Sequence, residues 1–275
     1  MRKILITTDL SANAQNAANY GVALLDSAET VFVFLNTFYV QHATDDSFFQ
    51  YSETVKAEAE ESLQKEIERI KKEYPELKSQ MEYHFEIGEI TDVANSFVHR
   101  EGISYMLMGT KGASGLTEFL VGSRTASMIK KVSCPLIIVP EQAKYRGLEK
   151  ILFTTDKELQ NEDLDLELLK ELAQKNQSSI QGLYISKTGE NLDVDATFIR
   201  YDLDIQFEDI KHHLDVDINS DPTEAIETYL HKHPVDLVAM ISTKGNLFYQ
   251  LFHKSVTKSV AMHTQTPMLI LHTKI

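Results

Sequence analysis

The chain has 275 residues, of which 43% are hydrophobic and 25% charged, and its formal net charge is −14. This composition is that of an ordinary globular protein, and an acidic excess in both halves argues against binding to nucleic acid or to an anionic membrane. No apolar run approaches the ~18 residues that span a bilayer, and the first residues lack the apolar core of a signal peptide. We therefore expect a cytoplasmic protein, in which the single cysteine, Cys134, is a small buried residue.

Strands and helices alternate along the first half of the chain. Apolar runs predict strands at 3–8, 30–38, 81–87, 104–108 and 136–139. Helical spacing predicts helices at 13–26, 45–74, 91–100 and 123–131. Ser11 is the expected N-cap of the first helix, and Gly102 the expected C-terminal stop of the third. Apolar strands separated by helices indicate a parallel sheet that is covered on both faces.

The long helix at 45–74 is strongly charged. We expect one face to pack inward and the charges to lie on a solvated face. The inward face consists of Val55, Ala59, Leu63, Ile67 and Ile70.

The second half repeats the first. Lys-Ile-Leu-Ile-Thr-Thr-Asp at 3–9 returns as Lys-Ile-Leu-Phe-Thr-Thr-Asp at 150–156. Met-Gly-Thr-Lys-Gly at 108–112 returns as Ile-Ser-Thr-Lys-Gly at 241–245, and the strand that begins Cys134-Pro returns as the one that begins Thr266-Pro. Because three landmarks recur in the same order, we predict two copies of one domain of about 140 residues, at 1–142 and 148–275.

The second copy keeps the alternation of strands and helices but differs from the first copy in its middle. Its predicted strands are 151–155, 179–185, 214–218, 237–241 and 268–271, and its predicted helices are 163–175, 223–231 and 254–263. The segment 189–213 is acidic and weakly periodic, and we assign no element to it.

A spaced glycine pattern lies between the fourth strand and the last helix of the first copy: Gly109, Gly112 and, after nine residues, Gly122-Ser123. Glycine lets the backbone approach an anion, and the N–H groups at a helix start point at it, so the pattern indicates a phosphate site. A tight turn without a ligand is the alternative.

Side chains around the glycines fit the same interpretation. Asp9, at the carboxyl end of the first strand, can accept hydrogen bonds from ribose hydroxyls, or can serve only to cap the following helix. Ser123 and Thr125 offer hydroxyls at a helix start, where the dipole favours anions. Lys111 and Arg124 are either phosphate-binding charges or solvent-exposed loop charges.

These residues together resemble the universal stress protein family, in its tandem two-domain form. The resemblance implies an α/β fold with two five-stranded parallel-sheet, Rossmann-like (adenine nucleotide alpha hydrolase-like) domains of strand order 3-2-1-4-5. It also implies ATP or a related adenine nucleotide as ligand and pairing of the two domains within the chain, and it leaves a homodimer open. Thr7 stands where the family often has proline.

The roles that the resemblance implies fall on nine residues. Thr8 and Asp9 would lie against the adenosine, and Thr37 against the adenine. The phosphates would be held by Gly109, Gly112, Gly122, Ser123 and the backbone at Arg124 and Thr125.

The second copy of the glycine pattern is damaged. In the sequence alignment Ser242 takes the place of Gly109, Lys254 replaces the glycine before Ser255, and the connection is one residue shorter and filled with bulky side chains. We therefore predict one nucleotide site per chain, in the first domain, with the second domain as a degenerate partner.

The expected function is that of a cytoplasmic stress-response binding module. No Walker loop, hydrolase nucleophile motif or metal-ligand cluster is present, so we assign no catalytic residue and no protein metal site. ATP hydrolysis, with Mg²⁺ on the phosphates, is expected to be slow at most because no dedicated base is visible. The alternative is a nucleotide-independent protein-interaction scaffold of the same fold.

Overall fold

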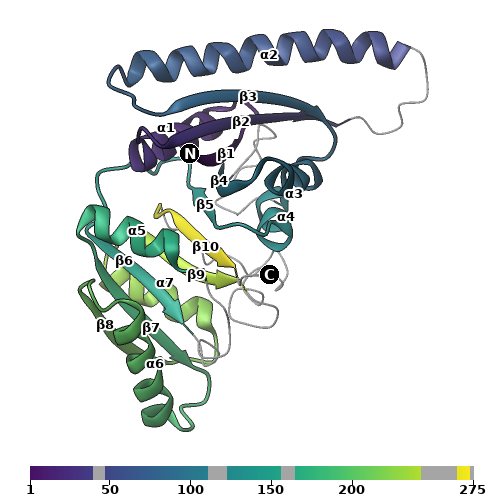
Figure 1. Cartoon of the computed structure of the whole chain (residues 1–275). Helices are drawn as coiled ribbons and strands as arrows, with labels where there is room; N and C mark the ends of the chain where they lie inside the picture. Colours follow the sequence, from purple (N-terminus) through teal and green to yellow (C-terminus); the bar gives the residue numbers. More distant parts are fainter. Residues whose placement is uncertain (40–46, 111–122, 156–164, 243–264, 273–275) are drawn as a thin grey trace. The chain divides into compact units, whose positions relative to one another are not determined.

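The computed structural model describes residues 1–39, 47–110, 123–155, 165–242 and 265–272. Contacts between residues divide the chain into two compact units, and the division falls after Lys144. Unit 1 precedes it and unit 2 begins at Tyr145. Strands and helices alternate in both units (Figure 1).

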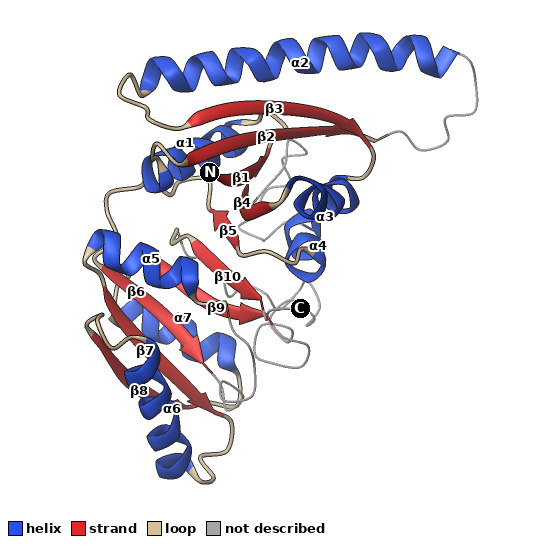
Figure 2. Ribbon diagram, viewed as in Figure 1, coloured by secondary structure: helices blue, strands red, loops and turns tan. Residues whose placement is uncertain are grey.

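Unit 1 is a five-stranded sheet with helices between its strands (Figure 2). In chain order its elements are β1 (Arg2–Thr7), α1 (Ala12–Leu25), β2 (Thr30–Phe38), α2 (Ser47–Glu73), β3 (Gln80–Ile87), α3 (Ile90–Glu101), β4 (Ile103–Gly109), α4 (Ser123–Lys131) and β5 (Leu136–Val139). The strands pair in parallel in the order β3-β2-β1-β4-β5. This order confirms the predicted 3-2-1-4-5 topology.

The core of unit 1 comes from its apolar strands. Ile4, Leu5 and Ile6 of β1 are fully buried, as are Phe32 and Phe34 of β2. Parallel strands that are apolar along their whole length need a layer of helices on each face. Helix α2 runs along β2 and β3, α1 contacts β4 and β5, and α3 packs against α4 (Figure 1).

Both predicted helix caps are confirmed. The Ser11 hydroxyl accepts a hydrogen bond from the Ala14 N–H at 3.3 Å and so caps α1. Gly102 ends α3 with φ at 63°, a left-handed conformation that glycine adopts without a steric penalty.

The inward face of α2 is confirmed in its second half and looser in its first. Leu63, Ile67 and Ile70 are buried, whereas Val55 and Ala59 are half-buried.

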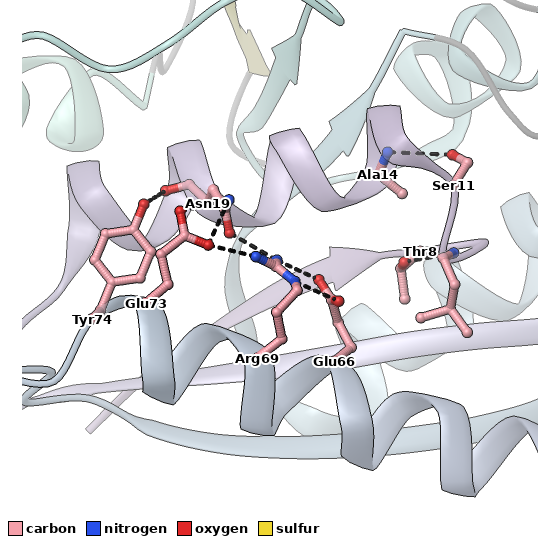
Figure 3. Close-up of polar contacts among 9 residues, drawn as sticks. Thr8, Ser11, Ala14, Asn19, Glu66, Arg69, Glu73 and Tyr74 are labelled. Atoms are coloured by element: carbon pink, nitrogen blue, oxygen red, sulfur yellow. Dashed lines mark hydrogen bonds and ion pairs between the residues drawn. The ribbon is translucent and has the colours of Figure 1, made fainter.

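One charged residue of α2 corrects the expectation of a fully solvated charged face. Glu66 is only 4% exposed, and its two carboxylate oxygens accept hydrogen bonds from Arg69 at 2.7 and 2.9 Å. Arg69 also donates to Asn19 of α1 at 2.8 Å and to Glu73 at 2.6 Å (Figure 3). A buried carboxylate is tolerated when it is paired, and this network joins α2 to α1.

Unit 2 has the same topology. Its elements are β6 (Lys150–Thr155), α5 (Glu167–Asn176), β7 (Ser179–Ser186), α6 (Leu192–Gln206), β8 (His212–Ile218), α7 (Pro222–Lys232), β9 (Leu237–Ser242) and β10 (Met268–His272). Read from β8, the parallel order is β8-β7-β6-β9-β10, which is again 3-2-1-4-5.

Two differences from the predicted elements of unit 2 stand out. The segment 189–213, to which we assigned no element, contains the 15-residue helix α6. Helix α5 begins at Glu167, later than the predicted start at 163, and Leu166 precedes it in a non-helical conformation. The predicted helix at 254–263 lies outside the described residues.

Two classes of feature are not found in the part of the chain that the structure describes. None of its helices has the length and apolar character needed to cross a bilayer. No group of three or more His, Cys, Asp or Glu side chains there is placed to hold a metal ion. Cys134 is buried as expected, and the loss of solvent raises the pKa of its thiol to about 12.

Candidate functional site at the carboxyl ends of β1 and β4

The turn after β1 is held by its own side chains. The Thr8 hydroxyl accepts the Leu10 N–H at 2.9 Å (Figure 3), and Oδ1 of Asp9 accepts the Ser11 N–H at 3.1 Å. Leu10 has φ at 62°, which a residue with a side chain adopts only at a cost. These two bonds hold the strained residue in place and bring Asp9 to the start of α1.

A second strand supports this turn from the side. The Thr8 N–H donates to the Leu35 carbonyl at 2.9 Å, and the Asn36 side-chain amide donates to the Thr8 carbonyl at 2.7 Å. The neighbouring Thr37 is half-buried and pairs with Glu86 of β3. Thr8, Asp9 and Thr37 are thus at the same edge of the sheet, as predicted for residues at the ends of adjacent parallel strands.

Gly109 ends β4 where α1 comes close to the strand. A Cβ atom at this position would lie 2.7 Å from Oδ1 of Asn13, a separation that real Cβ atoms do not show. Asn13 is itself 5% exposed. The close approach of Asn13 is therefore a reason for glycine at this position that the sequence did not reveal.

The first turn of α4 is tied to the end of β4. Thr125 is 2% exposed, and its hydroxyl lies 3.3 Å from the Gly109 carbonyl oxygen and 3.4 Å from that of Thr110. The hydroxyl donates to the backbone here and is not directed at solvent. Arg124, one residue earlier, is exposed.

The start of α4 therefore lies beside the carboxyl end of β4, and its first N–H groups have no partner one turn earlier within the helix. Such a helix start favours an anion. Ser123 opens the helix, while Gly112 and Gly122, the other two predicted glycines, lie outside the described residues.

A match to a family model decides the family. The model of the universal stress protein family matches residues 1–140. The chain belongs to this family.

Individual proteins and solved structures are similar to all or part of the chain. The universal stress protein MJ0531 of Methanocaldococcus jannaschii is 26% identical over 148 residues, which cover 52% of this chain and 84% of that protein. The crystal structure of a universal stress protein from Archaeoglobus fulgidus is similar in fold, with a TM-score of 0.69 at 18% identity, and the match covers 98% of this chain and 95% of that one. A universal stress protein family protein from Arabidopsis thaliana, solved with AMP bound, is 16% identical with a TM-score of 0.35. This match covers 51% of this chain and 92% of the Arabidopsis chain.

Two polar residues of the candidate site were not predicted. Asn13 and Asn36 both contact predicted site residues, the first at Gly109 and the second at Thr8. Each lies within a few residues of the carboxyl end of a strand. A polar side chain there, next to an apolar run, is the sequence signal that could have identified them.

Strand register corrects the alignment of the two copies. Val139 and Leu271 occupy the same position in the two matched last segments, and they pair with Gly109 and Ile241, respectively. The pairing of β1 with β4 and of β6 with β9 makes the same two residues equivalent. Ile241 therefore takes the place of Gly109, and the alignment that put Ser242 there was wrong by one residue. The shared Thr-Lys-Gly sequence lies beyond the strands and does not set their register.

The edge of unit 2 also differs at the second strand. By register, Tyr184 occupies the position of Asn36, and Ile185 that of Thr37. Tyr184 is buried, and its hydroxyl lies 3.2 Å from Oδ2 of Asp195 in α6. Ile185 is buried as well. Bulky buried side chains thus fill, in unit 2, positions that are polar in unit 1.

Proposed function

We propose that this protein is a cytoplasmic stress-response binding module that binds ATP, or a related adenine nucleotide, in unit 1. The observation that carries the proposal is the convergence of the Thr8–Asp9 turn, Thr37, Gly109 and the start of α4 at one edge of the sheet. Strand β1 lies between β2 and β4 there, which is the switch point where open parallel sheets bind ligands. Membership in the family supports the same ligand class.

The described residues fit the nucleoside end of the ligand through their side chains. Asp9 is half-buried and supplies carboxylate oxygens that accept from ribose hydroxyls. Thr37, also half-buried, supplies a hydroxyl near the expected adenine.

The phosphate end of the ligand would instead be bound by backbone groups. Because the Thr125 hydroxyl donates to the carbonyls of Gly109 and Thr110, the phosphates would be held by N–H groups at the start of α4. Mg²⁺ would accompany a triphosphate, and no side chain is assigned to it. We expect at most slow hydrolysis, because positioning alone gives little acceleration without a base.

The test is calorimetric titration of the nucleotide-free full chain with ATP and Mg²⁺. We expect one nucleotide per chain. Asp9→Asn keeps an oxygen acceptor for the Ser11 N–H but removes the charge, and a hydrogen bond to a charged group contributes about 1.5–3 kcal/mol. The variant should therefore bind ATP roughly 10-fold to 100-fold more weakly.

The repeat supplies a matched control. Asp156→Asn makes the same change in the second copy of the Thr-Thr-Asp sequence, and it should leave the affinity and the stoichiometry unchanged. Gly122→Lys, which copies the residue of the second half, should abolish binding. Absence of binding at low-millimolar ATP, or an equal loss in both Asp variants, would contradict the proposal.

A further inference from the structure

Helix α6 exposes a row of large apolar side chains. Val194, Phe198, Tyr201 and Ile205 are 55%, 53%, 64% and 54% exposed. Their spacing of four, three and four residues places them along one side of the helix. We call these four residues the α6 stripe.

The α6 stripe is separate from the face by which α6 packs on its own sheet. Ile199 and Leu203 are buried, and Leu203 reaches Gly182 of β7, where a Cβ atom would lie 2.8 Å from its Cδ1. The helix is therefore apolar on two sides, whereas a helix that only covers a sheet needs one. Burial in unit 2 does not account for the stripe.

The equivalent helix of unit 1 has no such stripe among its described side chains. Helix α2, like α6, connects the second and third strands of its unit. From residue 53 onward its exposed side chains are Glu, Lys, Gln, Thr and Ala. The fold therefore does not require an exposed apolar row at this position, and the row is a property of unit 2.

The spacing of the α6 stripe indicates what would cover it. Alternating steps of three and four residues form the seam by which one helix packs lengthwise on another. In that heptad, Phe198 and Ile205 occupy a positions, Val194 and Tyr201 occupy d positions, and Asp202 and Asp204 occupy the flanking e and g positions. Opposite charges at such flanking positions select the partner.

The surrounding charge gives the sign of the partner. Residues 189–218 contain nine Asp and Glu but only two Lys and Arg, and the Asp204 side chain is 63% exposed. An anionic membrane would be repelled by this surface. A second copy of α6 would bring acidic flanks against acidic flanks, which disfavours self-association.

We propose that the α6 stripe is the docking site for an amphipathic helix of a partner protein that is apolar along one side and carries Lys or Arg beside it. The apolar row would bury Phe198 and Tyr201 at the centre of the contact, where aromatic side chains contribute most. The acidic flanks would set orientation and the rate of encounter. This role is independent of nucleotide binding in unit 1.

The test uses the full chain and two designed, fluorescent three-heptad peptides. Both carry Leu at the a and d positions; one has Lys and the other Glu at e and g. We expect the Lys peptide to bind at least 10-fold more tightly than the Glu peptide, with an affinity that falls as salt rises. Phe198→Ser with Tyr201→Ser, which leaves every charge in place, should weaken the Lys peptide at least 10-fold.

A matched control separates the stripe from general attraction to an acidic protein. Ile87→Ser removes an apolar side chain of β3 that is 52% exposed, and it should leave peptide affinity unchanged. Far-ultraviolet circular dichroism should be the same for all variants, because the substituted residues are exposed. Equal affinity in the double variant and the unsubstituted chain, or a dimer that dissociates on the double substitution, would overturn the proposal.

Discussion

The carboxyl ends of β4 and β9 are equivalent in register, but they differ in what stands there. Gly109 leaves room for Asn13 of α1, whereas Ile241 is buried and 8% exposed. The second strands of the two units differ in the same direction, with Asn36 in unit 1 and Tyr184 in unit 2. One topology thus supports a polar strand edge in one copy and an apolar, filled edge in the other.

The repeat therefore preserves the sheet but not the residues at the ends of its strands. The pairing of the first, second and fourth strands is the same in both units. In an α/β fold the sheet supplies stability, while the residues at the strand ends supply function. Substitutions at these strand ends should therefore lower stability most in unit 2, and in unit 1 they should lower ligand binding as well as stability.

The largest effect is expected in unit 2 for Ile241→Gly, which gives the second copy the residue of the first. Loss of a buried isoleucine side chain costs about 2–5 kcal/mol, and glycine in a strand adds about 0.5–1 kcal/mol. We expect the free energy of unfolding in urea to fall by about 3–5 kcal/mol. Ile87→Gly, at an exposed strand position, is the control and should cost about 1 kcal/mol; an equally small loss at Ile241 would show that this edge is not packed as core.

A smaller effect is expected in unit 1 for Gly109→Ala. The added Cβ would overlap Oδ1 of Asn13 at 2.7 Å, and overpacking of this kind costs about 1–3 kcal/mol. Nucleotide affinity should fall as well, because the carbonyls of Gly109 and Thr110 hold the start of α4.

A double-mutant cycle with Asn13→Ala tests the cause of that loss. If Asn13 is the reason for glycine, the second substitution recovers part of the stability that Gly109→Ala removes. Additive losses would instead assign the requirement to another neighbour. A loss of nucleotide binding with no loss of stability would assign it to the ligand.

Much of the sheet could be predicted from the sequence because several of its strands, such as β2 and β5, are largely continuous apolar runs. The predicted strand at 30–38 coincides with β2, and that at 136–139 with β5. Strands buried on both faces read as continuous apolar runs bounded by polar residues, so their ends are well marked. The strand order followed from the resemblance that the glycine pattern and the repeat carried.

What the sequence did not predict depends on contacts between distant segments. Helix α6 is apolar on two sides, which blurs the single-sided period that identifies a surface helix. Buried Glu66 is paired with Arg69 of the same helix, and Arg69 in turn donates to Asn19 of α1, a contact that the sequence does not reveal. The role of Asn13 depends on how closely α1 approaches β4, which no local pattern encodes.

The helices that follow the second strands are also fixed in different ways. In unit 1, α2 is joined to α1 through Arg69, whose pKa the hydrogen bond to Glu66 raises further above neutrality. In unit 2, His212 at the start of β8 lies 2.9 Å, through Nε2, from Oδ1 of Asp204 in α6, and its Nδ1 lies 2.7 Å from the Ile210 carbonyl oxygen. A carbonyl oxygen and an ionised carboxylate can only accept a hydrogen bond, so both ring nitrogens of His212 must donate. This arrangement fits the doubly protonated ring.

The smallest effect, and one confined to unit 2, is therefore a pH dependence from His212. Burial lowers the pKa of His212, but the hydrogen bonds that its ring donates to Asp204 and to the Ile210 carbonyl outweigh this effect and leave the pKa raised. A raised folded-state pKa adds stability that is fully present below the unfolded value of about 6.5 and is lost as pH rises through the folded value. Because Asp204 is largely exposed, we expect the His212–Asp204 pair to contribute about 0.2–1 kcal/mol to the free energy of unfolding.

Urea unfolding of the unsubstituted chain and of His212→Gln at pH 5.5, 7 and 8.5 measures this contribution. The difference in unfolding free energy should be largest at pH 5.5 and shrink as pH rises, because glutamine does not titrate. His213→Gln is the control at the neighbouring histidine, whose Nε2 lies 3.3 Å from Oδ2 of Asp215. Curves for His212→Gln that run parallel to those of the unsubstituted chain would show that α6 is held to β8 without the charged ring, and that the two units do not differ in this respect.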